Sequence, residues 1–427
     1  MQYFPNLIFA LALITGFGFF GLNIRKLYRN INFGKDVDRK DRKSERLKNM
    51  MMIALGQSKM VKRPLSGFLH IIVYVGFVII NIEVLEIIID GLFGTHRVFL
   101  GVLSTELYGF LIGTFEVLAA LVFIAVVLFW LRRNVSNIKR FLSKEMNGWP
   151  KKDGNNILYF EMVLMSLFLI MNATDKQLQI LGAEHYIKAG SFPISSFLLP
   201  LFENLSQSSL IILERSAWWL HITGIFIFLN YLYFSKHLHI LLAFPNVYYG
   251  SVSPKGKFKN LASVTNEVKL MMDPTVDPFA APAEGISDPA KFGASDVLDL
   301  SRTQLLNAYT CTECGRCTSN CPANQTGKKL SPRKIMMDTR DRLEEVGKNI
   351  DTDGVFIPDN KQLLGDHITK EELWACTSCQ ACVDACPINI SPMGIILDMR
   401  RSLIMEDSKS PEPITTMFNN IENIYIY

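Results

Sequence analysis

A doubled cysteine motif in the last third of the chain restricts its fold more than any other feature. Each copy reads C-x2-C-x2-C-x3-C and is followed by proline. The first copy comprises Cys311, Cys314, Cys317 and Cys321, and the second comprises Cys376, Cys379, Cys382 and Cys386. Three thiolates at three-residue intervals fit around one face of a four-iron cubane. The doubled run is typical of two [4Fe–4S] clusters and uses all eight cysteines of the chain.

The fourth cysteine of each copy starts a helix, and the direction of this helix carries its thiolate toward the other cluster. We therefore expect crossed ligand sets. Cluster one would take Cys311, Cys314, Cys317 and Cys386. Cluster two would take Cys376, Cys379, Cys382 and Cys321. Pro322 and Pro387 would end the loops and help to keep solvent away from the sulfurs.

The residues before position 245 have the composition of a membrane domain. The chain is 49% hydrophobic and only 20% charged, against about 25% charged in a typical soluble protein. Crossing a bilayer core takes about 20 residues of apolar helix. Five stretches meet this length, over about 4–23, 65–89, 108–130, 157–173 and 218–244. We expect a mainly all-α protein in which residues 1–245 form a five-helix transmembrane bundle.

Basic loops indicate which side of the membrane each segment faces. The segment from Asn23 to Pro64 holds 13 Lys and Arg residues, and the segment 132–156 holds seven. In contrast, the loop between the second and third spans holds only Arg97, and the loop between the fourth and fifth spans holds three basic residues. Basic loops stay in the cytoplasm. We therefore expect a protein of the cytoplasmic (inner) membrane, with its N-terminus outside and its cysteine-bearing part in the cytoplasm.

Three further segments follow the predicted membrane domain. Residues 246–296 are rich in Pro, Gly, Ser and Lys, and predict an extended linker that includes Asp273-Pro274, Asp277-Pro278 and Ala281-Pro282. Residues 297–407 would form a ferredoxin-like helical domain with two clusters, and 408–427 a C-terminal tail. Ser331-Pro332 predicts a helix start, with the helix reaching about Val346, and a second helix is expected over about 393–405.

Three other classes of protein fit the sequence poorly. A disulfide framework is disfavoured because cytoplasmic thiols stay reduced. A structural zinc site needs only two C-x2-C pairs, so the third cysteine of each run would be unused. The net charge of +4 gives no indication of nucleic-acid binding.

Histidines in the second and fifth spans suggest a second cofactor. His221 and His239 are 18 residues apart, so a continuous helix would place them on one face, about 27 Å apart. His70 would lie about 9 Å inside the cytoplasmic end of its span, at a depth similar to that of His239. Two such imidazoles suit bis-histidine ligation of a b-type haem, because intramembrane ionisable residues are usually functional. The alternative is that these histidines are interfacial or hydrogen-bonded within the bundle. His221 has no obvious partner, so a second haem is open.

Acidic side chains gather in the outer half of the predicted bundle. Glu83 and Glu86 lie late in the second span, and Glu116 lies early in the third. Together with His221 they could form the proton-handling edge of a quinone site. The alternative is that these carboxylates are solvated at the helix ends.

Two groups of residues carry a resemblance to known families. Cys311-Thr-Glu-Cys-Gly-Arg-Cys-Thr-Ser-Asn-Cys-Pro-Ala, Leu330-Ser-Pro-Arg-Lys, Leu373-Trp-Ala-Cys-Thr-Ser-Cys and Asp398-Met-Arg-Arg resemble the small iron–sulfur subunit of heterodisulfide reductases. Trp218-Trp219-Leu-His221 with Ser235-Lys236-His237-Leu-His239 resembles the fifth span of the cytochrome b subunit of respiratory nitrate reductase. The second of the two haem ligands in the second span of that subunit matches no histidine here.

The resemblance implies a membrane-bound oxidoreductase that relays electrons between quinone and a cytoplasmic partner through b haem and two [4Fe–4S] clusters. It implies haem ligation by His70 and His239, and also by His221. Expected partners are a cysteine-rich redox subunit, which would carry the catalytic part for the soluble substrate, and an electron-transfer flavoprotein. Relatives often continue beyond the position of Tyr427. The alternative is a membrane-tethered iron–sulfur scaffold or sensor without haem or quinone chemistry.

Overall fold

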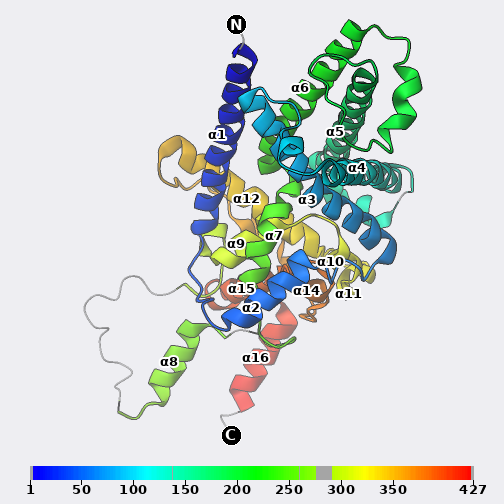
Figure 1. Cartoon of the computed structure of the whole chain (residues 1–427). Coiled ribbons are helices and arrows are strands. Elements are labelled where there is room, and N and C mark those ends of the chain that lie inside the picture. Colours follow the sequence, from blue (N-terminus) through cyan, green and yellow to red (C-terminus); the bar gives the residue numbers. More distant parts are fainter. Residues whose placement is uncertain (1–2, 137, 259, 276–290, 425–427) are drawn as a thin grey trace. The chain divides into compact units, whose positions relative to one another are not determined.

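The chain is helical (Figure 1). It divides into two compact units. The structure is a computed structural model that describes residues 3–136, 138–258, 260–275 and 291–424. Unit 1 comprises Met1–Arg25 and Gln57–Leu238, and unit 2 comprises Lys26–Gly56 and His239–Tyr427. Two isolated bridges occur in the described residues, which contain no β-strand. The expectation of a mainly all-α protein is confirmed.

Five helices are long and apolar enough to cross a membrane, as expected. They are α1 (Phe4–Asn32), α3 (Pro64–Phe93), α4 (Thr105–Asn134), α5 (Trp149–Ile180) and α6 (Gln207–Tyr231). Local signals set their ends: Ser104 Oγ accepts from the Leu107 N–H at 3.3 Å, and Gly94 ends α3 with φ 72°. Short turns join them, at η2 (Val98–Gly101), η3 (Lys139–Phe141), η4 (Lys144–Met146) and η5 (Ser195–Leu201).

The core of unit 1 lies where α3, α4, α5 and α6 pack against one another. Ile112, Phe115 and Phe168 are buried there, and the ring of Phe9 lies 5.5 Å from the ring of Trp218. The outer surface is also apolar, with side chains such as Phe110 and Leu220 exposed. An apolar surface of this extent is suited to lipid and not to water.

The fifth span ends earlier than the sequence predicted. Instead of one helix over 218–244, α6 ends at Tyr231 and is followed by two short turns, η6 (Leu232–Phe234) and η7 (Lys236–Leu238). Between them Ser235 adopts an extended backbone with φ −114° and ψ 146°. The prediction that His221 and His239 share one face of a continuous helix is therefore wrong.

Side-chain hydrogen bonds explain this break. The carboxylate of Asp153 accepts from the Tyr231 hydroxyl at 2.6 Å and from the Lys236 N–H at 3.1 Å. Ser235 Oγ accepts from the His237 N–H at 3.1 Å. Asp153 and Ser235 thus accept from two backbone N–H groups that a continuing helix would have paired with carbonyls, which offsets part of the cost of leaving the helix.

Unit 2 contains many shorter helices and two short elements from the basic segment before α3. Its elements are α2 (Lys43–Asn49), η1 (Met50–Leu55), α7 (His239–Tyr248), α8 (Ala262–Met272), η8 (Val297–Asp299), α9 (Arg302–Thr310), α10 (Arg316–Ser319), α11 (Pro322–Gln325), α12 (Pro332–Asp353), η9 (Leu363–His367), α13 (Lys370–Trp374), α14 (Ala381–Ala385), α15 (Pro392–Met405) and α16 (Glu412–Ile424). Ser331 Oγ accepts from the Lys334 N–H at 3.4 Å and caps α12, as Ser331-Pro332 predicted.

The predicted linker contains a helix, α8, which the Pro- and Gly-rich composition did not indicate. Asp273-Pro274 follows this helix directly, whereas Asp277-Pro278 and Ala281-Pro282 lie outside the described residues. Part of the basic segment from Asn23 to Pro64 belongs to unit 2. Arg46, fully buried, donates to the carbonyl of Gly250 at 2.7 Å, and Asn30 Nδ2 donates to the Tyr309 hydroxyl at 3.0 Å.

Candidate functional site

The two cysteine loops repeat the same backbone pattern. Glu313 and Gly315 have φ values of 53° and 70°, and Ser378 and Gln380, at the corresponding positions of the second loop, have 56° and 60°. Each loop then enters a short helix, α10 or α14, and these two helices pack against each other. Alternation of right- and left-handed residues turns successive backbone N–H groups toward one side, an arrangement that binds anionic groups such as iron–sulfur clusters.

The structure brings Cys386 to the cysteines of the first motif. Cys311, Cys314, Cys317 and Cys386 all line one small cavity, and Cys382 also contributes to its wall. The sulfur of Cys311 lies close enough to those of Cys314 and Cys386 to interact with them electrostatically. This is the group of four thiols that the sequence predicted for cluster one.

Cys321, in turn, lies among the cysteines of the second motif. Its sulfur is close enough to those of Cys376 and Cys382 to interact with them electrostatically, and so is the sulfur of Cys379. Cys379 is exposed, whereas Cys321 and Cys382 are buried. The group assembled here is the one predicted for cluster two, and its occupation by a cluster stays a prediction.

The thiols have the surroundings that a cluster needs. Burial raises the pKa of Cys311 and of Cys382 to about 12, so both thiols need bound iron to become thiolates at neutral pH. Backbone donors already point at sulfur: the N–H of Ser378 donates to Cys376 Sγ at 3.4 Å, and that of Ile390 to Cys386 Sγ at 3.3 Å. Such N–H···S bonds stabilise an anionic cluster and help to set its reduction potential.

A single metal ion would fit less well. Among the described residues, no group of three His, Cys, Asp or Glu side chains converges closely enough to hold one ion. A cubane separates its four thiolates by the width of the cluster, so wider spacing is what a [4Fe–4S] site requires.

Arginines surround both cysteine groups. Near the first, Arg333 is fully buried, and Arg340 forms an ion pair with the buried Glu313 at 2.8 Å. Near the second, Arg400 Nη2 donates to the carbonyl of Leu373 at 2.6 Å, and its guanidinium lies 4.9 Å from the centre of the Trp374 ring. Positive charge beside a cluster favours its reduced state, which carries one more negative charge.

The predicted haem histidines are distributed over the two units. His70 lies in the second turn of α3 in unit 1, and His239 is the first residue of α7 in unit 2. His221 is buried in the middle of α6, and its Nδ1 lies 3.0 Å from the carbonyl oxygen of Leu164. His237 Nε2 lies 4.0 Å from Glu161. Ligation of a haem by His70, His239 or His221 stays a prediction.

The predicted acidic group is divided in the structure. Glu83 and Glu86 line a cavity of about 390 Å³ in unit 1, but Glu116 and His221 do not line it. Glu116 Oε2 accepts from the N–H groups of Ile194 and Ser195, at 2.9 and 3.1 Å. Glu116 thus holds the segment that enters η5, a role that spacing in the sequence does not reveal.

Sequence reasoning missed the buried arginine that lines the same cavity as Glu83 and Glu86. Arg97 is buried at the cavity and donates to Asp175 at 2.7 Å and to Asn172 at 3.1 Å. In the sequence, Arg97 stands out only as a charge in a loop. A lone arginine between two apolar spans, with an aspartate at the end of another span, is the signal that could have indicated a buried ion pair.

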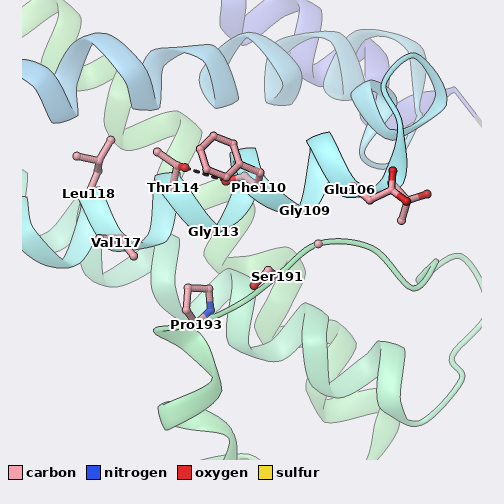
Figure 2. A pocket seen from close by; sticks show the side chains of 11 residues that line it. Glu106, Gly109, Phe110, Gly113, Thr114, Val117, Leu118, Ser191 and Pro193 are labelled. Carbon is pink, nitrogen blue, oxygen red and sulfur yellow. Dashed lines mark hydrogen bonds between the residues drawn. The ribbon is translucent and has the colours of Figure 1, made fainter.

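A larger groove of about 630 Å³ lies along the start of α4 (Figure 2). Its walls are mainly apolar, from Phe110, Val117 and Leu118 of α4 and Pro193 of the facing segment. The Thr114 hydroxyl donates to the Phe110 carbonyl at 2.8 Å, which occupies its only proton. Glu106 is the one acidic side chain among the residues that line the groove, so the groove offers little proton chemistry.

Comparisons with known proteins agree with the cysteine pattern. Residues 304–390 match the family described as 4Fe-4S dicluster domain. The chain is 27% identical to the probable iron-sulfur-binding oxidoreductase FadF of Bacillus subtilis, over 92% of this chain and 54% of the relative. It is 25% identical to the EtfAB:quinone oxidoreductase of Syntrophomonas wolfei, over 91% of this chain and 53% of the relative. The chain thus spans about half the length of these two relatives.

A third relative covers a shorter region. It is a subunit of the ferredoxin/F(420)H(2)-dependent CoB-CoM heterodisulfide reductase of Methanosarcina acetivorans, 30% identical over 28% of this chain and 60% of the relative. No solved structure matches the chain. None of these relatives is a nitrate reductase, so that resemblance stays a prediction, whereas the expectation of an oxidoreductase agrees with the names of all three. The chain therefore carries a 4Fe-4S dicluster domain and is homologous to iron–sulfur oxidoreductases and to a heterodisulfide reductase subunit.

Proposed function

We propose that this chain relays electrons between quinone in the membrane and a cytoplasmic redox partner. The observation that carries the proposal is the presence, in one chain, of five helices able to cross a membrane and of eight cysteines gathered into two groups of four. The relative from Syntrophomonas wolfei is named as a quinone oxidoreductase, which supports quinone as the membrane substrate.

Two [4Fe–4S] clusters would carry the electrons in unit 2. Cluster one is held by Cys311, Cys314, Cys317 and Cys386, and cluster two by Cys376, Cys379, Cys382 and Cys321. The clusters supply one-electron transfer, and the protein sets their potentials through hydrogen bonds, charge and burial. Because Cys379 is exposed, cluster two is the one from which electrons reach a soluble partner.

The cysteine-bearing unit faces the cytoplasm and the N-terminus lies outside. Part of the basic segment 23–64, which begins inside α1, belongs to the same compact unit as the cysteines, which supports this orientation. Arg29 and Lys26 pair there with Asp351 of α12, the second of these ion pairs at 3.2 Å. A segment so rich in Lys and Arg is expected to remain on the cytoplasmic side.

A b-type haem bound by His70 and His239 is part of the proposal. Haem would supply a further one-electron step. A contact of His221 also supports a role as haem ligand. Metal-bound histidines commonly donate their second ring N–H to a carbonyl, and Nδ1 of His221 can donate to the Leu164 carbonyl in this way. His221 is thus proposed as a ligand of a second haem.

The soluble partner supplies the part of the reaction that this chain lacks. The names of the relatives support a cysteine-rich subunit of heterodisulfide reductase type or an electron-transfer flavoprotein. Either partner would exchange single electrons with cluster two and carry the site at which a soluble substrate changes by two electrons.

Anaerobic mixing of the purified, cluster-loaded chain with quinone tests the proposal. Clusters reduced with dithionite should be reoxidised by a short-chain benzoquinone or naphthoquinone, as followed by paramagnetic resonance. As a control, Cys311 and Cys376 are both replaced by serine. This variant measures any quinone reduction that does not depend on intact clusters. Clusters that stay reduced in excess quinone of both types would contradict the proposal.

A further inference from the structure

The cavity of about 390 Å³ in unit 1 has an unusual balance of charge. Five carboxylates line it, from Glu83, Glu86, Asp90, Asp175 and Glu214, against only two guanidinium groups. Trp218 and Trp219 also line it and offer flat ring faces. In a low-dielectric bundle an excess of carboxylates is costly unless each has a partner or takes up a proton.

Two of the five carboxylates hold the backbone around the cavity. Glu86 Oε1 accepts from the Phe99 N–H at 2.9 Å, and Glu86 Oε2 lies 3.0 Å from the Tyr108 hydroxyl. Asp90 accepts from the N–H groups of Arg97 and Val98, at 2.7 and 3.2 Å. These bonds occupy oxygen atoms of both carboxylates and fix both groups in place.

Two more are paired with arginine. Asp175 accepts from Arg97 Nε at 2.7 Å and from Gln179 at 3.0 Å. Glu214 pairs with Arg215 and accepts from the Tyr186 hydroxyl at 2.9 Å. Neither carboxylate can take up a proton without losing an ion pair, which is costly at buried sites.

Glu83 is the remaining carboxylate, and it differs from the other four. Its side chain is 3% exposed and lines the cavity, yet its Oε2 has no hydrogen-bond partner among the described residues. It interacts electrostatically with Arg97, Glu86, Glu116 and Asp175, so negative neighbours outnumber the positive one. Glu83 thus has an oxygen atom that can accept a hydrogen bond from a ligand in the cavity.

We propose that this cavity binds the head group of a quinol and that Glu83 accepts the proton when the quinol is oxidised. This inference rests on the proposed function, because the electrons must leave to the two oxidised [4Fe–4S] clusters, one to each. In the reaction both quinol O–H bonds break: the proton of one moves to the Glu83 carboxylate, and the proton of the other leaves to solvent. One quinol thus yields one quinone, two electrons and two protons.

His96 provides the route between the cavity and solvent. Its side chain is 23% exposed, its Nε2 lies 3.7 Å from Asp175, and its buried Nδ1 has no hydrogen-bond partner among the described residues. Burial lowers the pKa of His96 more than Asp175 raises it, with Arg97, Arg215 and Glu214 also acting on the ring. The imidazole is therefore neutral at pH 7 and free to pass a proton outward.

Substitution of Glu83 tests this assignment against a matched control. Quinol oxidation by the cluster-loaded chain should fall at least about 100-fold in Glu83→Gln, the size expected for loss of a proton acceptor. Glu83→Asp should retain part of the rate with a shifted pH profile. Glu106→Gln, the same change in the separate groove of Figure 2, should leave the rate unchanged. Iron content and binding of a redox-inactive quinone analogue report on folding of each variant.

The outcomes separate the two proposals. A wild-type chain that oxidises neither benzoquinol nor naphthoquinol would overturn the proposed function and, with it, this inference. An active wild-type chain whose Glu83→Gln variant is equally fast, with an unchanged pH profile, would overturn the assignment of Glu83 alone. Loss of rate in Glu106→Gln but not in Glu83→Gln would place the quinol in the other groove.

Discussion

Cys386 and Cys321 each lie among the cysteines of the other motif. This crossed arrangement determines which cluster is disturbed when a single cysteine is replaced. Cys386→Ser should disturb the cluster held by Cys311, Cys314 and Cys317 and spare the one nearest to it in sequence. Paramagnetic resonance of variants with one cysteine replaced at a time distinguishes the two clusters. A loss confined to the cluster of the second motif would show that each motif binds its own cluster.

The haem assignment also depends on single residues. His70→Ala or His239→Ala should abolish the b-type absorption spectrum after dithionite reduction, because bis-histidine ligation needs both imidazoles. His237→Ala is the matched control, because His237 is not one of the proposed haem ligands. Unchanged absorption in both ligand variants would contradict the assignment.

Arg342 shows how a charged side chain can stabilise unit 2. It is fully buried, and it donates to Asp296 at 2.9 Å and to Asp359 at 2.5 Å. Arg342→Met should lower the free energy of unfolding by roughly 2–4 kcal/mol, because two carboxylates lose their partner. Thermal unfolding of the full chain in detergent measures this. Lys348→Met, an exposed change on the same helix, should cost little, and equal losses in both variants would refute the role of Arg342.

At the scale of elements, the cysteine loops are a repeat whose left-handed positions differ in residue type. Gly315 has φ 70°, where a side chain is strained, whereas the second loop holds Gln380 at φ 60°. Gly315→Ala should cost about 1 kcal/mol and speed the loss of cluster one to an iron chelator. Gln380→Gly should not speed the loss of cluster two. Equal chelation rates for Gly315→Ala and the wild-type chain would contradict this reading of the loop.

The sequence predicted the elements whose signals are local. Five apolar runs indicated five spans, and Ser331-Pro332 indicated the start of α12, because hydropathy and capping depend on adjacent residues. The break at Ser235 was not predictable in this way, because it depends on Asp153, which is more than 80 positions away. The same holds for Glu116, which hydrogen-bonds to Ile194 and Ser195 of a distant segment.

At the scale of the whole molecule, the chain combines a membrane unit with a unit that gathers the cysteines, although the boundary between them is not a single point in the sequence. Lys26–Gly56 joins the cysteine unit, a tertiary arrangement that composition alone does not indicate. Composition did indicate the apolar and cysteine-rich parts, because lipid exposure and cluster ligation each demand particular residue types.

The central claim is that electrons pass between quinol and the two clusters of this chain. Sealed membrane vesicles that contain the chain should develop the paramagnetic signals of reduced clusters when their quinone pool is reduced anaerobically. The signals should disappear when the pool is reoxidised. Clusters that respond to dithionite but stay unchanged through both steps would contradict the account.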